Sequence, residues 1–146
     1  GLSGFAVDVY ARHAVVYSLS ESLDRHAPAL ATAVAKVLQP ASIISKVRPL
    51  GEAPTGKIPF RVEHGDEPPR SIQVREDDLV MEVHLTGGLN TGLFLDMRDV
   101  RRALRPFLNN KRMLNTFSYT GVFTVLAGLA GAKSVTSVDF ASGVLD

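Results

Sequence analysis

The sequence contains no cysteine among its 146 residues. This absence excludes disulfide bonds, thiolate metal sites and a cysteine nucleophile within these residues. It is compatible with a reducing cytosol, and we expect a cytoplasmic protein. The sequence also lacks an uninterrupted apolar run long enough to cross a bilayer and lacks the basic-then-apolar pattern of a signal peptide. We therefore expect no membrane partner.

A marked excess of charge is missing as well, since 16 Lys and Arg residues against 15 Asp and Glu residues leave a formal net charge of +1. Bulk electrostatics gives no argument for nucleic-acid binding, so such a case must rest on local clusters. The four histidines are scattered without the spacing of a metal site, and we expect no metal. The chain begins with glycine and not methionine, and we expect it to be part of a longer protein.

Residues 1–86 have the pattern of a small α+β domain. Residues 4–19 predict a β-hairpin, and apolar residues spaced by three and four predict a helix over 23–38. Pro28 fits only an early turn of that helix, and Asp24 or a nearby serine can cap its start. Further strands are predicted at 43–47, 60–62, 72–74 and 79–85. The strands at 72–74 and 79–85 follow a connection rich in proline and glycine over residues 51–70, which contains the short strand at 60–62.

Residues 87–146 have a different character. Their patterns predict in turn a helix over 97–105, a strand at 113–115, a helix over 120–129, a strand at 134–138 and a helix from 141. Strands that alternate with helices at this spacing indicate βαβ units and a parallel sheet. We therefore expect a second domain, over 87–146, that forms the first part of an α/β, Rossmann-like fold.

The turn after the strand at 113–115 has the features of a nucleotide site. In such sheets, ligands lie outside the carboxyl ends of the strands, where Gly121 permits close backbone approach. Asp139 ends the next strand and can accept both ribose hydroxyls, although an aspartate there can also simply cap the following helix. The dinucleotide fingerprint needs small residues where this turn has Phe117, Tyr119 and Thr120. A ligand without phosphates, such as S-adenosylmethionine, suits this bulkier turn.

Two segments resemble the motifs of a known family. Residues 115–121, Asn-Thr-Phe-Ser-Tyr-Thr-Gly, are similar to the cofactor motif of the large-subunit ribosomal RNA cytosine-5 methyltransferase family. Residues 86–99 resemble its second signature, a Gly-Gly-x-x-Thr-Gly run followed by Phe-Leu-Asp-x-Arg-Asp. Residues 65–69, Gly-Asp-Glu-Pro-Pro, and the order of the preceding elements are similar to the central domain of that family. The likeness covers nearly the whole chain.

The resemblance implies an α+β central domain followed by the first part of a class I methyltransferase domain. It implies S-adenosylmethionine as cofactor and ribosomal RNA as substrate, with methyl transfer to carbon 5 of a cytosine. It also implies an RNA-binding domain before Gly1. Arg98 would pair with the cofactor carboxylate, the residues after 116 would wrap its amino-acid end, and Asp139 would take the ribose. The implied cofactor-binding residues are Thr91, Phe94, Asp96, Arg98, Asn115, Phe117, Ser118, Tyr119, Thr120, Gly121 and Asp139.

The chain also departs from the family's pattern. Val122 stands where members usually carry a second glycine, and Leu89-Asn90 replaces the common Gln-Lys pair. In the family, a cysteine attacks carbon 6 of the pyrimidine, and this cysteine and an Asp-Pro-Pro type motif lie downstream of the ribose-binding acid. Because the chain ends at residue 146 and has no cysteine, we expect an incomplete, inactive fragment with no catalytic residue of its own.

Four arginines, Arg98, Arg101, Arg102 and Arg105, occupy positions i, i+3, i+4 and i+7 and so line one helix face, here named the arginine row. Val100, Leu104, Phe107 and Leu108 would form the opposite, buried side. The row is either a solvated surface or a functional one, in which Arg101, Arg102 and Arg105 contact RNA phosphates. The acidic run Glu76-Asp77-Asp78 is expected to be solvated.

Two further alternatives stay open at this point. Phe117 and Tyr119 could pack in the core, although the resemblance favours Tyr119 in a pocket wall and Phe117 in both roles. The whole chain could also be a non-catalytic RNA-binding or assembly module whose sheet serves only as a scaffold. Since a partial parallel sheet exposes an unpaired edge, a homodimer is a further expectation.

Overall fold

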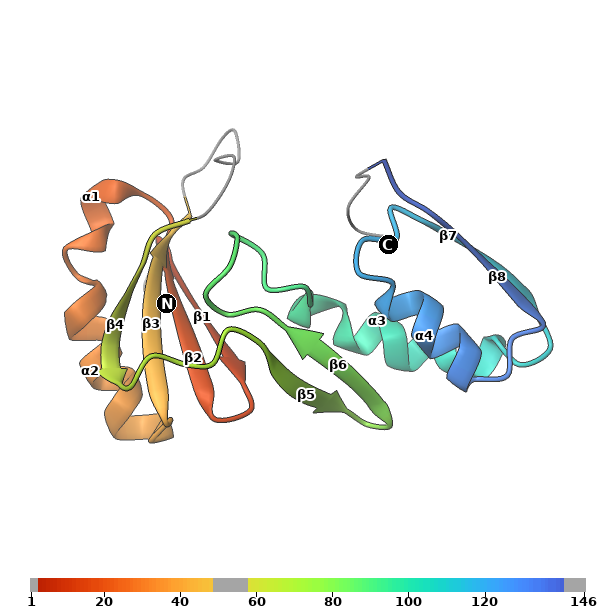
Figure 1. Cartoon of the computed structure of the whole chain (residues 1–146), viewed down its shortest axis with the longest axis horizontal. Helices are drawn as coiled ribbons and strands as arrows, with labels where there is room; N and C mark the ends of the chain where they lie inside the picture. Colours follow the sequence, from red (N-terminus) through yellow and green to blue (C-terminus); the bar gives the residue numbers. More distant parts are fainter. Residues whose placement is uncertain (1–2, 49–57, 141–146) are drawn as a thin grey trace. The chain divides into compact units, whose positions relative to one another are not determined.

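The computed structural model describes residues 3–48 and 58–140. The chain forms two compact units, Gly1–Val74 with Glu82–Thr91, and Arg75–Met81 with Gly92–Asp146. Figure 1 shows the elements of each unit. One boundary between the units lies between Thr91 and Gly92. Residues 75–81, here named the hairpin tip, belong to the second unit, although the segments on both sides of them belong to the first. The division into domains at 86 and 87 stays a prediction.

The first unit is built on a four-stranded mixed sheet in the order β1-β2-β3-β4 (Figure 1). The β1–β2 and β3–β4 pairs are antiparallel, whereas β2 and β3 are parallel and are joined through helices α1 and α2. The elements are β1 (Phe5–Tyr10), β2 (His13–Ser18), α1 (Glu21–Asp24), α2 (Ala27–Leu38), β3 (Ser42–Val47) and β4 (Phe60–Gly65). The hairpin predicted over residues 4–19 and the strand predicted at 43–47 are confirmed.

Helix α2 packs its apolar stripe on one face of this sheet. The core cluster joins Ala27, Ala31 and Val34 of the helix to residues of β2 and β3, namely Ala14, Val16 and Ile43. The predicted single helix over 23–38 is divided in two, and α2 begins at Ala27 because Pro28 is tolerated only in a first turn. Asp24 is not the cap, since it forms an ion pair with Arg61 and His26 is the N-cap residue of α2. The alternative, a nearby serine, holds for the first segment, because Ser20 is the N-cap residue of α1, although its side chain makes no capping hydrogen bond.

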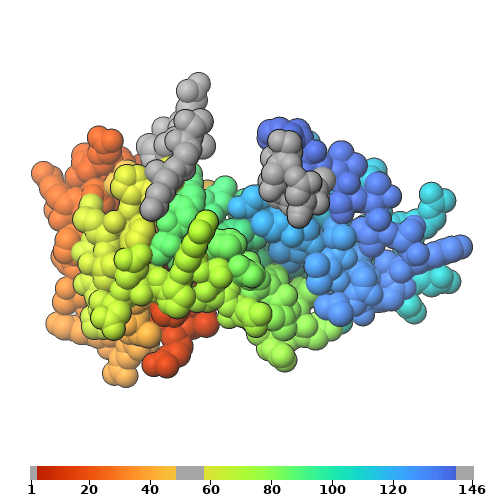
Figure 2. Space-filling view, viewed as in Figure 1, coloured from red at the N-terminus to blue at the C-terminus, as the bar shows by residue number. Residues whose placement is uncertain are grey.

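Strand β4 is longer than the predicted strand at 60–62 and forms an edge of the sheet. Its register against β3 shifts between Ile43 and Ile44, which is a β-bulge. Gly65 ends the strand with φ +67°, and a Cβ there would collide with the carbonyl oxygen of Ala41. Glycine is therefore required at this corner. In the space-filling view, the yellow-green atoms of β4 lie on the surface of the first unit (Figure 2).

A two-stranded sheet, β5 (Ile72–Glu76) with β6 (Leu79–Val83), carries the hairpin tip. Leu79, Met81 and Val83 are buried and alternate with exposed residues, which confirms the half-buried strand that the sequence predicts. The strand ends two residues earlier than predicted. The side chain of His84 is half exposed and lies 3.6 Å from the carboxylate of Glu82.

The second unit contains a βαβ motif. Strands β7 (Arg112–Thr116) and β8 (Ser134–Val138) are parallel and in register, and α4 (Val122–Leu129) connects them. Before this motif stand α3 (Arg98–Leu104) and two 3₁₀-helices, η1 (Leu95–Met97) and η2 (Arg105–Phe107). The alternation of strands and helices is confirmed. The helix predicted from residue 141 lies outside the described residues.

The predicted buried side of the helix over 97–105 is partly wrong. Leu108 is buried, but Val100 is half exposed and Phe107 is 70% exposed. Pro106 lies in η2, so the chain turns away from the axis of α3 before Phe107 can reach the face predicted for it. Within residues 3–48 and 58–140, none of the helices is both long enough and apolar enough to cross a membrane.

Candidate functional site: a pocket at the carboxyl end of β7

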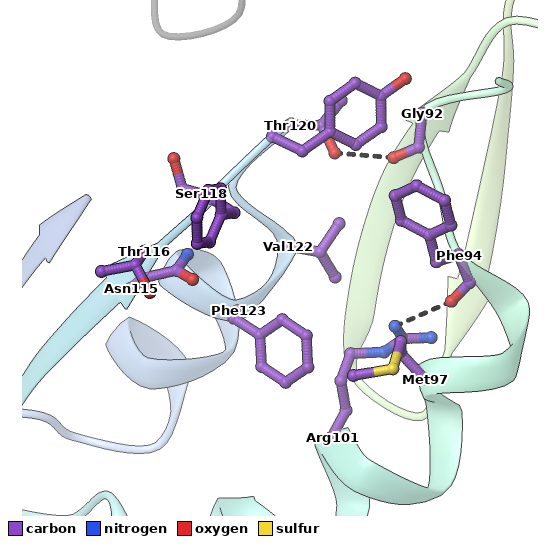
Figure 3. A pocket seen from close by; sticks show the side chains of 12 residues that line it. Gly92, Phe94, Met97, Arg101, Asn115, Thr116, Ser118, Thr120, Val122 and Phe123 are labelled. Carbon is purple, nitrogen blue, oxygen red and sulfur yellow. Dashed lines mark hydrogen bonds between the residues drawn. The ribbon is translucent and has the colours of Figure 1, made fainter. Parts of the chain in front are cut away.

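A pocket of about 240 Å³ lies in the second unit, and Figure 3 shows its walls. One wall comes from the segment before α3, and the other comes from the end of β7, the turn that follows it and the start of α4. Figure 3 shows the ring of Phe94 and the side chain of Val122 on facing sides. The lining residues are Gly92, Phe94, Met97, Arg101, Asn115, Thr116, Phe117, Ser118, Tyr119, Thr120, Val122 and Phe123.

The turn over residues 117–121, here named the cofactor turn, has an unusual backbone. Phe117, Tyr119 and Gly121 all have left-handed φ values, of 55°, 46° and 76°. Residues other than glycine rarely adopt this conformation, and they cluster at ligand sites where the surrounding structure holds them. The N–H of Ser118 donates to the carbonyl of Val138 (3.1 Å), so strand β8 fixes the turn.

Asp139 follows β8 and supports the same turn. Its Oδ2 accepts the backbone N–H of Tyr119 at 2.8 Å, across 20 residues of sequence. This bond places the carboxylate beside the cofactor turn, at the carboxyl edge of the parallel pair. The helix start that Asp139 is alternatively predicted to cap lies outside the described residues.

Ser118 supplies a polar atom that faces the pocket without a partner. Its side chain lines the pocket and the residue is 7% exposed, and its Oγ has no hydrogen-bond partner among the described residues. A buried hydroxyl without a partner costs free energy, of the order of 1–3 kcal/mol. A ligand with a polar group at this point would recover that cost, so the pocket fits a partly polar ligand.

Two contacts join the facing walls. The hydroxyl of Thr120 donates to the carbonyl of Gly92 (2.6 Å), and the rings of Phe94 and Tyr119 lie 5.5 Å apart, tilted by 51°. Burial raises the pKa of the Tyr119 hydroxyl, so this phenol stays neutral. Aromatic and apolar walls with a few polar groups are typical of sites for small organic ligands.

A hydrogen-bonded chain under the pocket fixes the βαβ motif. Asn115 of β7 donates through Nδ2 to the hydroxyl of Thr124 on α4 (3.0 Å), which bonds the hydroxyl of Ser137 on β8 (2.6 Å). Asn115 is buried and lines the pocket. These bonds hold both strands against the helix that follows the cofactor turn.

Most of the residues predicted to bind the cofactor gather at this pocket. Phe94, Asn115 and the four residues 117–120 line it, and Gly121 and Asp139 complete the turn and its support. Phe117 is 80% exposed, so it does not also pack in the core as expected. The position of these residues is observed, whereas their contact with a cofactor stays a prediction.

Three predicted residues do not line the pocket. Thr91 belongs to the first unit, where its hydroxyl donates to the hydroxyl of Tyr10 (2.8 Å). Asp96 is exposed, and Arg98 forms an ion pair with Glu76. Six residues that line the pocket are not among those predicted to bind the cofactor. They are Gly92, Met97, Arg101, Thr116, Val122 and Phe123. All six lie within or beside the segments 86–99 and 115–121, so closeness in sequence to these segments is the signal that could have identified them.

The interpretation of the arginine row as a solvated surface is wrong for Arg101, which is 2% exposed. Its guanidinium donates to both carboxylate oxygens of Glu76, at 2.7 and 2.6 Å. Glu76 is buried as well, so the predicted solvated acidic run is also wrong at this residue. The guanidinium of Arg101 holds the pKa of Glu76 below its usual range. A buried Arg101 is a poor candidate for an RNA contact.

Two further arginines of the row, Arg102 and Arg105, pair with the other two acids. Arg102 forms two hydrogen bonds with Asp77, of 2.9 and 3.0 Å, and Arg105 pairs with Asp78. The hairpin tip and α3 thus carry complementary charges. Their partners lie 25 to 27 residues apart in sequence, which is why the arginine row alone does not reveal the pairing.

Residues 59–146, more than half of the chain, match the model of a family described as S-adenosylmethionine-dependent methyltransferase. The chain belongs to the S-adenosylmethionine-dependent methyltransferase family. The match runs from just before β4 to the last residue and includes every residue that lines the pocket. The cofactor expected from the sequence is therefore the cofactor of the family.

Relatives of this methyltransferase chain agree with the family. It is 35% identical over 147 residues to ribosomal RNA large subunit methyltransferase I of Alteromonas mediterranea. The alignment covers all of this chain and 37% of the relative. An S-adenosylmethionine-dependent methyltransferase from Streptococcus mutans has a TM-score of 0.83 and 28% identity, over 97% of this chain and 36% of that one. A methyltransferase in complex with S-adenosylhomocysteine has a TM-score of 0.82 and 28% identity, with the same coverage.

These comparisons confirm the fold class, an α+β part followed by the first part of a class I methyltransferase domain. This methyltransferase chain spans 37% of the length of the curated relative and 36% of the S. mutans protein.

Proposed function

We propose that this chain carries the S-adenosylmethionine site of a methyltransferase that modifies large-subunit ribosomal RNA. The observation that carries the proposal is the buried, unpartnered Ser118 hydroxyl in a pocket at the carboxyl ends of β7 and β8, beside Asp139. The family supports the cofactor. The RNA substrate is supported by the relative from A. mediterranea, whose name states that it acts on ribosomal RNA.

The ribose and the amino-acid end of the cofactor would each meet a polar group of the site. The carboxylate of Asp139 would accept the ribose hydroxyls, and the cofactor turn would wrap the amino-acid end, where the Ser118 hydroxyl offers a hydrogen bond. The rings of Phe94 and Tyr119 would form apolar walls. Thr91, Asp96 and Arg98 stay predicted neighbours of the cofactor. When bound, the cofactor supplies a methyl group on a positively charged sulfur.

The finer proposal is transfer to carbon 5 of a cytosine, and it rests on the resemblance of residues 86–99 and 115–121. That chemistry needs a nucleophile that attacks carbon 6. The chain contains no cysteine, so a cysteine nucleophile would have to come from outside these 146 residues. Action on ribosomal RNA would place the protein in the cytoplasm.

The test is calorimetric titration of the chain with S-adenosylmethionine and, in parallel, S-adenosylhomocysteine. We expect saturable binding of both ligands, and weaker binding by Asp139→Ala. The loss of one or two charge-assisted hydrogen bonds, each of about 1.5–3 kcal/mol, weakens binding by roughly tenfold or more. Asp139→Asn keeps an acceptor for Tyr119, so it separates loss of charge from loss of the turn.

Asp99→Ala is the matched control, since it removes an exposed carboxylate that does not line the pocket. Its affinity should equal that of the unchanged chain. If a folded sample binds neither ligand, the proposal is overturned. Binding of RNA by that same sample would then favour a non-catalytic RNA-binding or assembly module.

A further inference from the structure

We propose that Arg101 and Glu76 are positioning residues for the pocket, because together they fix the wall that carries Phe94. The inference rests on the proposed function, since it assigns a role in cofactor binding to two residues outside the recognised cofactor motif. Both residues, the Phe94 wall and the pocket belong to the second unit.

The guanidinium of Arg101 is held rigidly by its carboxylate partner. Nε donates to Oε1 of Glu76 at 2.7 Å, and Nη2 donates to Oε2 at 2.6 Å. This bidentate contact fixes the plane of the guanidinium and hence the direction of its remaining N–H groups. The Nε of Arg98 also donates to Glu76, at 3.2 Å, so the carboxylate is restrained from two sides.

The third bond of Arg101 reaches the pocket wall. Its Nη1 donates to the carbonyl oxygen of Phe94 at 3.0 Å, and Figure 3 shows this bond. The ring of Phe94 is the one that faces Tyr119 of the cofactor turn, and Phe94 is 46% exposed. Because this ring is not enclosed by a core, its position depends on how the backbone at Phe94 is held.

Stability alone does not account for this pair. Arg102 with Asp77 and Arg105 with Asp78 already join the hairpin tip to α3 at its exposed side. A buried ion pair carries a large desolvation cost, and its replacement by apolar residues is often neutral or stabilising. Unlike the two exposed pairs, the buried pair also bonds the pocket wall, through Arg101 and the carbonyl of Phe94.

The decisive variant is the double substitution Glu76→Leu with Arg101→Met, which removes both charges and keeps an apolar contact. We expect its melting temperature to stay near that of the unchanged chain. We also expect its dissociation constant for S-adenosylhomocysteine to rise about tenfold, the size of losing one charge-assisted hydrogen bond. If the pair only supported folding, its removal would not raise the dissociation constant while leaving the melting temperature unchanged.

A second variant covers failure to fold. Arg101→Lys keeps a charge for Glu76 but has no planar fork with which to reach Phe94 at the same time, so its affinity should fall while its fold is kept. The matched control is Asp77→Leu with Arg102→Met, the same replacement on the exposed pair one residue along. That control should bind S-adenosylhomocysteine as the unchanged chain does.

The outcomes separate this inference from the proposed function. If the unchanged chain does not bind S-adenosylhomocysteine, the proposed function fails first. If it binds and the folded variants of Glu76 and Arg101 bind equally well, only the positioning role is overturned. An equal loss in the control pair also overturns it, because the effect would then belong to the docking of the hairpin tip in general.

Discussion

Lys46 is a charged residue in a place that would suit an apolar one. It lies on β3, an inner strand of the four-stranded sheet, is 1% exposed, and donates through Nζ to the carbonyl of Gly88 at 2.8 Å. Burial disfavours the charged form and lowers the pKa of Lys46 to about 8. Gly88 belongs to the segment 86–99 that resembles the second family signature, so this lysine anchors part of that segment to the sheet of the first unit.

The lowered pKa predicts a pH dependence of stability. Between about pH 8 and the ordinary lysine pKa of 10.5, the unfolded chain binds more protons at this residue than the folded chain. Stability therefore rises with pH across this window, because the cost of burying the charge disappears. We expect the free energy of unfolding, measured in urea at several pH values, to rise more steeply in the unchanged chain than in Lys46→Met. Equal slopes would contradict the buried-charge interpretation.

At the scale of elements, the βαβ motif depends on a small polar network. The hydroxyl of Thr124 links Asn115 of β7 to Ser137 of β8. Polar bonds between a helix and both strands of a parallel pair are more restrictive than apolar packing, because each needs a particular distance and direction. They therefore help to set the angle at which α4 leaves the cofactor turn.

Removing the central hydroxyl should uncouple the helix from the strands. Thr124→Val keeps the shape of the side chain but leaves the amide of Asn115 and the hydroxyl of Ser137 without their partner. We expect a loss of about 1–3 kcal/mol in the free energy of unfolding, measured with guanidinium chloride. Thr136→Val is the control, since Thr136 lies on β8 with its side chain exposed. A comparable loss in the control would mean that the network has no special role.

At the scale of the whole molecule, RNA contact is a prediction that now concerns Arg102 and Arg105. Both are exposed enough to meet phosphates, but each is already paired with an aspartate of the hairpin tip. The hydrogen bond to Arg102 lowers the pKa of Asp77, so this aspartate stays charged at neutral pH and competes with a phosphate for the arginine. An RNA contact would require these side chains to exchange partners.

Charge reversal tests that prediction. We expect Arg102→Glu with Arg105→Glu to weaken binding to a large-subunit ribosomal RNA transcript, and to reduce the salt slope of the binding constant by about one for each lost phosphate contact. Fluorescence anisotropy across a salt series measures both quantities. Arg25→Glu with Lys36→Glu changes the net charge equally on the first unit. If both double variants lose the same affinity, the effect is one of bulk charge.

The homodimer also stays a prediction at this scale. Leu114 and Val138 of the β7–β8 sheet are exposed, at 64% and 50%. A second copy of the chain could cover this surface. Sedimentation velocity over a range of concentrations distinguishes a dimer from a monomer.

The sequence by itself determined the features that depend on local pattern. Strand β8 has the predicted bounds, and the turn between β7 and α4 lies where a strand pattern changes into a helix pattern. The acidic residue after β8 reaches the cofactor turn because the carboxyl ends of neighbouring parallel strands meet at one edge. These features follow from periodicity and from the geometry of one βαβ motif.

Tertiary structure decided which partners the charged and polar residues take. The row Arg98–Arg105 predicts a charged helix face, but only folding brings Glu76 against Arg101, across 25 residues, and so buries one arginine and leaves its neighbour exposed. Thr91 meets Tyr10 across 81 residues in the same way. The physical reason is that local periodicity assigns a face to a side chain, whereas its partner, burial and pKa depend on which distant segment packs against that face.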